Sequence, residues 1–386
     1  MMIRVVCRKE SFIYNAYHLV KAFFPDEEVR SEKDAEIIDE IQVISDDEEG
    51  AVISVGGVPD RETAILFLYD RLADLTGREL PWGVLTGVRP VKLACRMLDR
   101  FPEEGEFVDW FRETRRVSDK KAILARNVAI KERTLIDLVR KKADSPVEKT
   151  FSLYVNIPFC PSICSYCSFS LGTIEALKDR AEDYIDALCM ELRYIAEEEG
   201  LNDPVTIFIG GGPPTALNPH QLEKLLECIR GFFSKERLLE FTLEAGRPDS
   251  ITPEKLGILK ESGVTRLCIN PQTMQQRTLD LIGRAHTVSE VFRAFDLARS
   301  FGFSNINMDL IAGLPGEGSS DMEDTLEKVS GLDPESLTVH ALAVKRAAAI
   351  SKNTVSEKEM EIMTDLAQDA AERLGMKPYY LYRQKS

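Results

Sequence analysis

The fold is decided by one stretch of the sequence, Phe151-Ser152-Leu153-Tyr154-Val155-Asn156-Ile157-Pro158-Phe159-Cys160-Pro161-Ser162-Ile163-Cys164-Ser165-Tyr166-Cys167. Its first part, 151–157, has the apolar and β-branched character of a strand, and the loop that follows carries three cysteines in C-x3-C-x2-C spacing. Thiolates this close together repel one another unless a cation takes up their charge. The loop therefore predicts a bound metal ion or metal cluster.

The occupant of this loop can be narrowed by counting ligands. A structural zinc ion needs four protein ligands, and neither a histidine nor a fourth cysteine lies near Cys160, Cys164 and Cys167 in the sequence. Three thiolates suit a cubane iron–sulfur cluster in which one iron stays open to a substrate or cofactor. Two other interpretations stay open, namely buried structural cysteines and a zinc ion completed from a distant site. The spacing and position favour the cluster over both.

The chain from this strand onward alternates strand and helix. Such alternation predicts an α/β fold with a parallel sheet and right-handed crossovers. Six units are too few for a closed eight-stranded barrel, but they allow an open partial barrel, with chemistry at the carboxyl ends of the strands. The expected strands are Phe151–Ile157, Val205–Ile209, Leu239–Leu243, Arg266–Asn270, Asn305–Ile311 and Ser336–Ala341; the expected helices are Glu175–Glu199, Pro219–Phe233, Pro253–Ser262, Val288–Phe301, Ser320–Ser330 and Ser356–Leu374.

The first third of the chain has a different rhythm and carries no catalytic constellation. The expected strands are Ile3–Cys7, Glu40–Ser45 and Ala51–Val55, and the expected helices are Ser11–Phe24 and Arg61–Gly77. Ser11 is the expected N-cap of the first helix, and a mostly helical stretch runs on to Lys142. The charged segment Lys141–Lys149 is the preferred boundary. We therefore expect a small α/β accessory domain with a helical linker over 1–145 and a catalytic core over 146–375.

The composition is that of an acidic globular protein. The 386 residues include 49 Lys and Arg against 64 Asp and Glu, a formal charge of −15, so a general attraction to nucleic acid is not expected. No apolar run is long enough to span a bilayer, and the N-terminus lacks the apolar segment of a signal peptide. We expect a cytoplasmic protein without a membrane span, whose eight cysteines serve as ligands or core residues rather than as disulfides.

The segment Tyr154–Phe169 resembles the radical S-adenosylmethionine (SAM) enzymes, and among them the oxygen-independent coproporphyrinogen III oxidases. The N-terminal third, including Leu80–Pro90, resembles the HemZ-type branch of that family. The resemblance implies a partial (β/α)6 barrel preceded by the small α/β domain. It also implies a [4Fe-4S] cluster held by Cys160, Cys164 and Cys167, with SAM bound at the open iron.

Further positions match, in order along the chain, the residues with which the family binds SAM. Taken alone, each would be a turn, a cap or a surface charge, and only their shared place near strand ends gives them weight. Pro213 departs from the family, which usually has threonine there, and this removes one backbone N–H and one hydroxyl from the pocket. No separate catalytic side chain is identified. The matching positions are Tyr154, Tyr166, Gly211, Gly212, Pro213, Glu244, Gln272, Arg284, Asp309 and Ala343.

The resemblance also implies an activity. It is the oxidative decarboxylation of coproporphyrinogen III propionates to vinyl groups, giving protoporphyrinogen IX in haem biosynthesis, with a flavodoxin- or ferredoxin-like electron donor. Residues 376–386 resemble the start of the family's C-terminal domain, which helps to cover the substrate and is otherwise missing here. Two alternatives stay open: a related radical SAM tetrapyrrole methyltransferase or ring-opening enzyme, and a haem-binding chaperone on the same fold. The four histidines of the chain weigh weakly against a haem carrier.

Overall fold

The chain is divided into two compact units, which are described separately. The computed structural model describes residues 2–33, 42–46, 50–55, 60–87, 89–143, 150–168, 172–198, 204–343 and 355–382. The first unit comprises Met1–Leu135 with Pro378–Ser386, and the second comprises Ile136–Lys377. The domain boundaries expected after residues 145 and 375 stay a prediction.

The first unit contains a small α/β structure. Its elements are β1 Met2–Cys7, α1 Glu10–Phe23, β2 Glu28–Lys33, β3 Gln42–Asp46, β4 Gly50–Val55 and α2 Arg61–Thr76. Within the described residues the strands form one sheet in the order β2-β1-β4-β3, in which β1 is parallel to both neighbours and β3 is antiparallel to β4. The sequence does not predict β2, because EVRSEK is polar and buries only Val29.

The expected end of the second helix at Gly77 is confirmed, whereas the expected N-cap of the first helix is wrong. The Asp60 side chain accepts a hydrogen bond from the Thr63 amide over 3.0 Å, and Gly77 ends α2 with a left-handed φ of 63°. Ser11, by contrast, is not the N-cap of α1. The helix begins at Glu10, the cap position falls on Lys9, and no side chain caps it.

Three helices follow in the expected helical stretch. They are α3 Pro90–Met97, α4 Glu104–Arg115 and α5 Asp119–Ala143. Their apolar faces form a separate cluster, in which the rings of Phe107 and Phe111 stack with centroids 4.8 Å apart. Both rings are fully buried, and burying a Phe side chain contributes about 1.5–3 kcal/mol.

A parallel sheet in the second unit positions the cysteine loop. Its strands are β5 Ser152–Ile157, β8 Thr206–Gly211, β9 Glu240–Leu243, β10 Arg266–Cys268, β11 Ile306–Ala312 and β12 Ser336–Ala341. Within the part of the chain that is described, they form one six-stranded sheet in the order β12-β11-β10-β9-β8-β5, with every neighbouring pair parallel. The expected strands and the partial (β/α)6 barrel are therefore confirmed.

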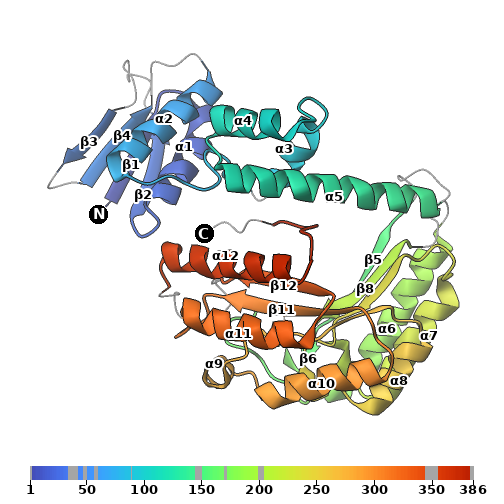
Figure 1. Ribbon diagram of the computed structural model, residues 1–386. Coiled ribbons are helices and arrows are strands. Elements are labelled where there is room, and N and C mark those ends of the chain that lie inside the picture. The colour runs from blue at the N-terminus through green and yellow to red at the C-terminus, as the bar shows by residue number, and fades with distance from the viewer. Residues whose placement is uncertain are drawn as a thin grey trace. The chain divides into compact units, whose positions relative to one another are not determined.

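Helices follow these strands and cover the outer side of the sheet (Figure 1). They are α6 Lys178–Glu197, α7 Pro219–Phe232, α8 Pro253–Glu261, α9 Gln276–Leu281, α10 Val288–Ser300, α11 Ser319–Leu332 and α12 Glu357–Arg373. The starts of α7 and α10 are fixed by capping boxes, Asn218 with Gln221 and Thr287 with Glu290. The sequence misses only the short α9 among these, because its six residues carry too little periodicity.

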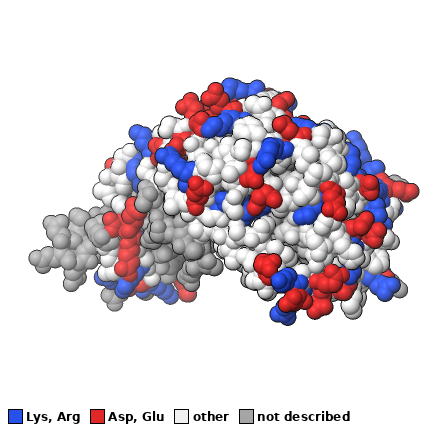
Figure 2. Space-filling model, turned by 90° about the horizontal axis from the view of Figure 1, so that it is seen from below, with Lys and Arg blue, Asp and Glu red and all other residues white. Residues whose placement is uncertain are grey.

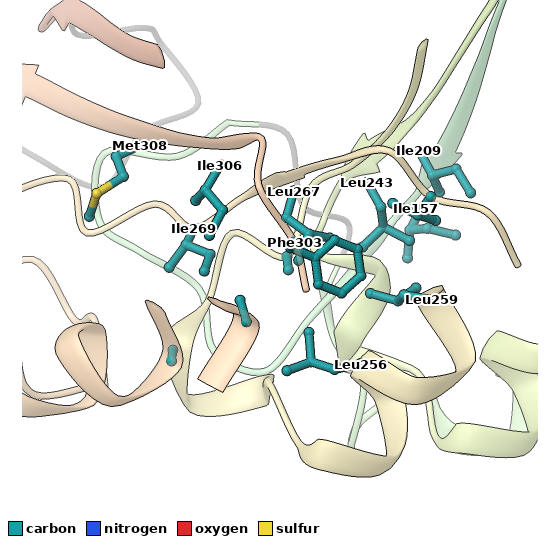
Figure 3. Close-up of a cluster of buried hydrophobic side chains, with 14 of the residues drawn as sticks. Ile157, Ile209, Leu243, Leu256, Leu259, Leu267, Ile269, Phe303, Ile306 and Met308 are labelled. Atoms are coloured by element: carbon teal, nitrogen blue, oxygen red, sulfur yellow. The ribbon is translucent and has the colours of Figure 1, made fainter. Parts of the chain in front are cut away.

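The main core lies between the sheet and these helices (Figure 3). Leu243 and Leu267 point from β9 and β10 toward Leu256 and Leu259 of α8, and Phe303 fills the space beside them. Because side chains alternate along a strand, burying one set of residues turns the other set to the opposite face of the sheet. That opposite face, together with the carboxyl ends of the strands, carries the polar residues of the candidate site.

One cysteine prediction is wrong. Cys189 of α6 and Cys228 of α7 are joined by a disulfide, with Cα atoms 5.9 Å apart, whereas the sequence predicts two core thiols. Both residues do pack against the apolar core, as expected. The pairing depends on which faces of the two helices meet, and sequence spacing does not reveal this. Cys7 and Cys268 are buried, as expected of core residues.

The surface carries charges of both signs. On the face that Figure 2 presents, acidic and basic side chains lie close to one another rather than in separate fields. Ion pairs such as Arg277 with Asp321 and Lys328 with Asp324 likewise bring opposite charges together. Among the described residues, no helix is both long and apolar enough to cross a membrane.

Candidate functional site

The cysteine loop begins at the carboxyl end of β5. Cys160 lies in β6, Phe159–Cys160, which pairs in parallel with β7, Gly172–Thr173. Cys164 is buried, and Cys160 and Cys167 are half-buried. In the described ranges, no group of three or more His, Cys, Asp or Glu side chains is arranged to hold a metal ion. The three thiols share one short loop, but the described conformation does not bring them together as a ligand set.

Two neighbouring segments anchor this loop. The Ser165 amide donates a hydrogen bond to the Ile282 carbonyl over 3.0 Å, and the Ser162 hydroxyl donates to the Gly283 carbonyl over 3.3 Å. Arg247, which is buried, donates from Nη1 to the Ser162 hydroxyl over 2.8 Å. The loop is therefore held by the segment after α9 and by the segment after β9, on both sides of Cys164.

The glycine motif at the end of β8 is required by close packing. A Cβ atom at Gly210 would overlap Glu244, one at Gly211 would overlap the Asn156 side chain, and one at Gly212 would overlap the Phe159 carbonyl. Gly211 also has a φ of 97°, which other residues rarely adopt. The motif therefore lets the strand end approach both the cysteine loop and Glu244.

Glu244 follows β9 and faces these glycines. Its Oε2 accepts a hydrogen bond from the Gly211 amide over 3.3 Å, and its Oε1 accepts one from Asn270 Nδ2 over 3.2 Å. Burial, with a smaller contribution from the charge of Asp309, raises the pKa of Glu244 to about 7. The carboxylate is thus poorly solvated and would be stabilised by a cationic group beside it.

Gln272 is held in an unusual backbone conformation. Its φ is 68°, in the left-handed region that residues other than glycine seldom occupy, and it is buried. Its amide donates to the Asp309 carbonyl and its carbonyl accepts from the Ile311 amide, both over 2.9 Å. Pairing to β11 therefore fixes the strained residue beside the strand that carries Asp309.

Arg284 links the cysteine loop to two strand ends. Its Nη2 donates to the carbonyls of Gly246 and Asn270, while its Nη1 lies 3.2 Å from the Tyr166 hydroxyl and 3.8 Å from Cys164 Sγ. The guanidinium is buried, so it faces the cysteine sulfur in a medium that strengthens electrostatic interactions. In this conformation the guanidinium of Arg284 contacts residues of the cysteine loop itself.

Asp309 lies within β11 and is mostly buried. Its Oδ1 accepts a hydrogen bond from Asn307 Nδ2 over 2.6 Å, and its Oδ2 lies 4.0 Å from His340 Nε2. Burial raises the pKa of Asp309, and His340, Asn307 and Thr338 partly offset that effect. Asp309 and Glu244 are therefore two carboxylates whose environments disfavour the charged form.

The remaining predicted residues lie nearby with fewer specific contacts. Tyr154 is 58% exposed and stacks on Phe208, with ring centroids 5.7 Å apart. Burial and then the charge of Glu244 raise the pKa of Tyr154. Pro213 is buried and precedes a single 3-10 turn, and Ala343 is half-buried at the end of a described range. Tyr166 packs with Ile282 and Leu314.

The chemistry of the donors, rather than the spacing of the thiols in this conformation, fits a cluster and a positively charged, amino-bearing ligand. Hydrogen bonds run from Gly211 to Glu244, from Asn270 to Glu244, and from Arg284 to both Asn270 and Cys164. Asn270 Oδ1 is buried and has no hydrogen-bond partner among the described residues, so an acceptor is left over beside the Glu244 carboxylate. Three thiols, one carboxylate and one unused amide oxygen suit these two groups.

Sequence reasoning misses three residues that the structure places at the site. Asn270 was included only as the end of an expected strand, although its side chain contacts Glu244. Arg247 directly follows the Glu244 motif, and Ser162 lies inside the cysteine motif, yet their contact bridges 85 positions. A buried arginine beside a cysteine loop is a signal only once the fold is known.

Comparison with known proteins identifies the domain. The Radical SAM superfamily matches residues 154–329. An oxygen-independent coproporphyrinogen-III oxidase-like protein of Bacillus subtilis, HemZ, is 37% identical over 335 residues, which cover 84% of this chain and 66% of that protein. The heme chaperone HemW of Bacillus subtilis is 42% identical over 195 residues, covering 50% of this chain and 51% of that protein.

A solved structure agrees with these sequence comparisons. Coproporphyrinogen III oxidase (HemN) from Escherichia coli, a radical SAM enzyme, matches with a TM-score of 0.54 and 28% identity, over 62% of this chain and 56% of that one. The chain thus spans slightly less than two thirds of the HemZ relative and about half of the others.

The sheet, the cysteine loop and these matches define a radical SAM domain. Within that superfamily, the chain is similar to the coproporphyrinogen-III-oxidase-like protein HemZ and to the oxidase HemN, as its resemblance predicts. Proteins of this class use a [4Fe-4S] cluster and SAM.

Proposed function

We propose that this chain takes part in the oxidative decarboxylation of the propionate groups of coproporphyrinogen III. The observation that carries the proposal is the likeness to the HemZ protein, 37% over 335 residues, which extends from the radical SAM domain into the N-terminal unit. In each of two rounds, one propionate loses a hydrogen atom, then carbon dioxide and one electron, and becomes a vinyl group. That electron passes to a one-electron acceptor.

The residues of this chain have defined tasks in that proposal. Cys160, Cys164 and Cys167 hold the cluster as thiolates, and the Arg284 guanidinium stabilises the charge on Cys164. Glu244 accepts hydrogen bonds from the amino group of SAM, in place of water that its burial has removed. When bound, the cluster and SAM supply one-electron cleavage of SAM, and with it hydrogen abstraction from an unactivated carbon. A flavodoxin- or ferredoxin-like protein is the proposed electron donor.

A second candidate function is haem delivery. The likeness to the HemW chaperone, 42% over 195 residues, supports it, because this is a higher identity than that to HemZ over a shorter stretch. Fold alone does not separate the two activities. Against haem delivery stands the shorter coverage, since the HemW match reaches only half of this chain.

One paired experiment separates these functions. Anaerobically reconstituted protein is incubated with SAM, dithionite and coproporphyrinogen III, and the tetrapyrroles are separated by chromatography. In parallel, haemin is titrated into the same preparation and its absorbance is followed. If the chain is a decarboxylase, we expect SAM-dependent vinyl products and no saturable haemin complex. Saturable haemin binding without any vinyl product would replace this proposal with the chaperone.

A further inference from the structure

We propose that Arg247 and Ser162 are positioning residues that hold the cysteine loop against the strand end carrying Glu244. The inference rests on the proposed function, because it assumes that Cys160, Cys164 and Cys167 bind the cluster. It adds two side chains that are not cluster ligands, and it assigns them a task that can be measured in the metal-free protein as well.

The orientation of Arg247 is fixed before it reaches the loop. Its Nε and Nη2 donate to the two carboxylate oxygens of Asp249, over 2.9 and 2.8 Å. This bidentate pair sets the plane of the guanidinium and leaves Nη1 directed at Ser162. Arg247 is only 3% exposed, so water cannot readily replace these hydrogen bonds.

Ser162 passes this constraint into the cysteine loop. It stands between Cys160 and Cys164, accepts from Arg247 over 2.8 Å, and donates to the Gly283 carbonyl over 3.3 Å. The hydroxyl therefore uses both its acceptor and its donor capacity, each on a different neighbouring segment. Removing it would take away both contacts and leave, between Arg247 and the loop, only the longer hydrogen bond to the Ser162 carbonyl, over 3.4 Å.

The register between the loop and Glu244 follows from this contact. Arg247 lies three positions after Glu244, so the segment that carries the carboxylate also carries the arginine that holds the loop. Small displacements of a positioning contact can reduce reactivity by large factors. The Arg247–Ser162 contact thus fixes the distance between the cysteine thiols and the Glu244 carboxylate.

The test uses Ser162→Ala and Ser162→Thr. A third variant, Arg247→Lys, changes the other partner of the Arg247–Ser162 contact. Arg193→Gln serves as the control, because it removes an arginine from an exposed ion pair on α6. Hydrogen exchange of residues 158–168 is measured in the metal-free full chain. After anaerobic reconstitution, the rate at which a chelator removes iron is measured, together with the melting temperature.

We expect Ser162→Ala and Arg247→Lys to speed both loop exchange and iron loss about tenfold, without faster exchange in the rest of the second unit. Ser162→Thr, which keeps the hydroxyl, and Arg193→Gln should behave as the native chain. Unchanged exchange and iron loss in Ser162→Ala would overturn the inference, as would faster exchange throughout the unit. If the native chain binds no iron, the proposed function fails, while hydrogen exchange of the cysteine loop still tests the Arg247–Ser162 contact.

Discussion

The main-chain amide of Gly211 donates a hydrogen bond to Oε2 of Glu244 across 3.3 Å, joining the glycine turn after β8 to the carboxylate after β9. Asn270 supplies the second donor, over 3.2 Å, from the next strand along the sheet. Three neighbouring strand ends therefore meet at one carboxylate. Its pKa is nevertheless raised to about 7, because burial outweighs the hydrogen bond from Gly211.

The raised pKa of Glu244 predicts a pH dependence of stability in the metal-free protein. Above the ordinary value of 4.5, the folded state binds more protons at this group than the unfolded state does. The stability it contributes is full below that value and is lost as the pH rises through about 7. The loss amounts to at most about 3 kcal/mol.

Urea unfolding at about pH 5 and pH 8 measures this effect. The free energy of unfolding of Glu244→Gln, minus that of the native chain, should be larger at pH 8 than at pH 5. The reason is that glutamine cannot ionise and so does not lose stability as the pH rises. Glu223→Gln, which removes an exposed carboxylate from α7, is the control for net charge. An identical pH dependence in the native chain and Glu244→Gln would contradict the proposed environment of this carboxylate.

The two buried carboxylates should also govern SAM affinity. Calorimetry on cluster-loaded Glu244→Gln and Asp309→Asn should show SAM binding weakened by roughly tenfold to a hundredfold, the cost of losing a buried charged acceptor. Iron content is measured in the same samples, since the substitutions should leave the cluster in place. Native affinity in both variants would mean that neither carboxylate contacts the cofactor.

Close packing at Gly212 makes a stability prediction that is independent of any ligand. A Cβ atom there would overlap the Phe159 carbonyl, so Gly212→Ala should lower the free energy of unfolding by about 1–3 kcal/mol. Gly231→Ala in α7 is the matched control, because a Cβ atom there meets nothing within 4 Å. In a helix, alanine should stabilise by up to about 1 kcal/mol. Equal effects of the two changes in denaturant unfolding would rule out the close approach.

The barrel could be predicted from the sequence because its strands are buried. Residues such as Ile207, Leu243 and Leu267 give short apolar runs, and the helices between them have clear amphipathic periods. The edge strand β2 could not be predicted in this way, because it is polar and exposed. Helix starts are less well specified by the sequence: α6 begins at Lys178 rather than at Glu175, and α1 begins at Glu10, which is why the expected cap at Ser11 is wrong.

The site could be predicted only where a residue type itself indicates chemistry. Three closely spaced cysteines do so, whereas Asn270 and Arg247 owe their places to contacts between distant segments. Arg284 is the clearest case: its partners Cys164 and Tyr166 lie 120 and 118 positions away. The left-handed φ of Gln272 likewise arises from pairing with β11 rather than from its neighbours in the sequence.

The three cysteines should act together in holding iron. Reconstituted native chain should bind about four irons and four sulfides per molecule. Replacing Cys160, Cys164 and Cys167 with serine should abolish that uptake, because the cluster would lose all of its proposed thiolate ligands. A Cys95→Ser variant, changed outside the motif, controls for loss of a thiol. Stoichiometric zinc in the native chain, or iron retained by the triple variant, would contradict the proposed cluster.

The proposed reaction is tested most directly by following the hydrogen that leaves the substrate. Coproporphyrinogen III carrying deuterium on its propionate chains is incubated anaerobically with reconstituted protein, SAM and dithionite, and 5′-deoxyadenosine is analysed by mass spectrometry. We expect deuterium in 5′-deoxyadenosine, together with vinyl products, and neither in the triple cysteine variant. Formation of 5′-deoxyadenosine that contains only ordinary hydrogen, with the propionates intact, would contradict hydrogen abstraction from this substrate.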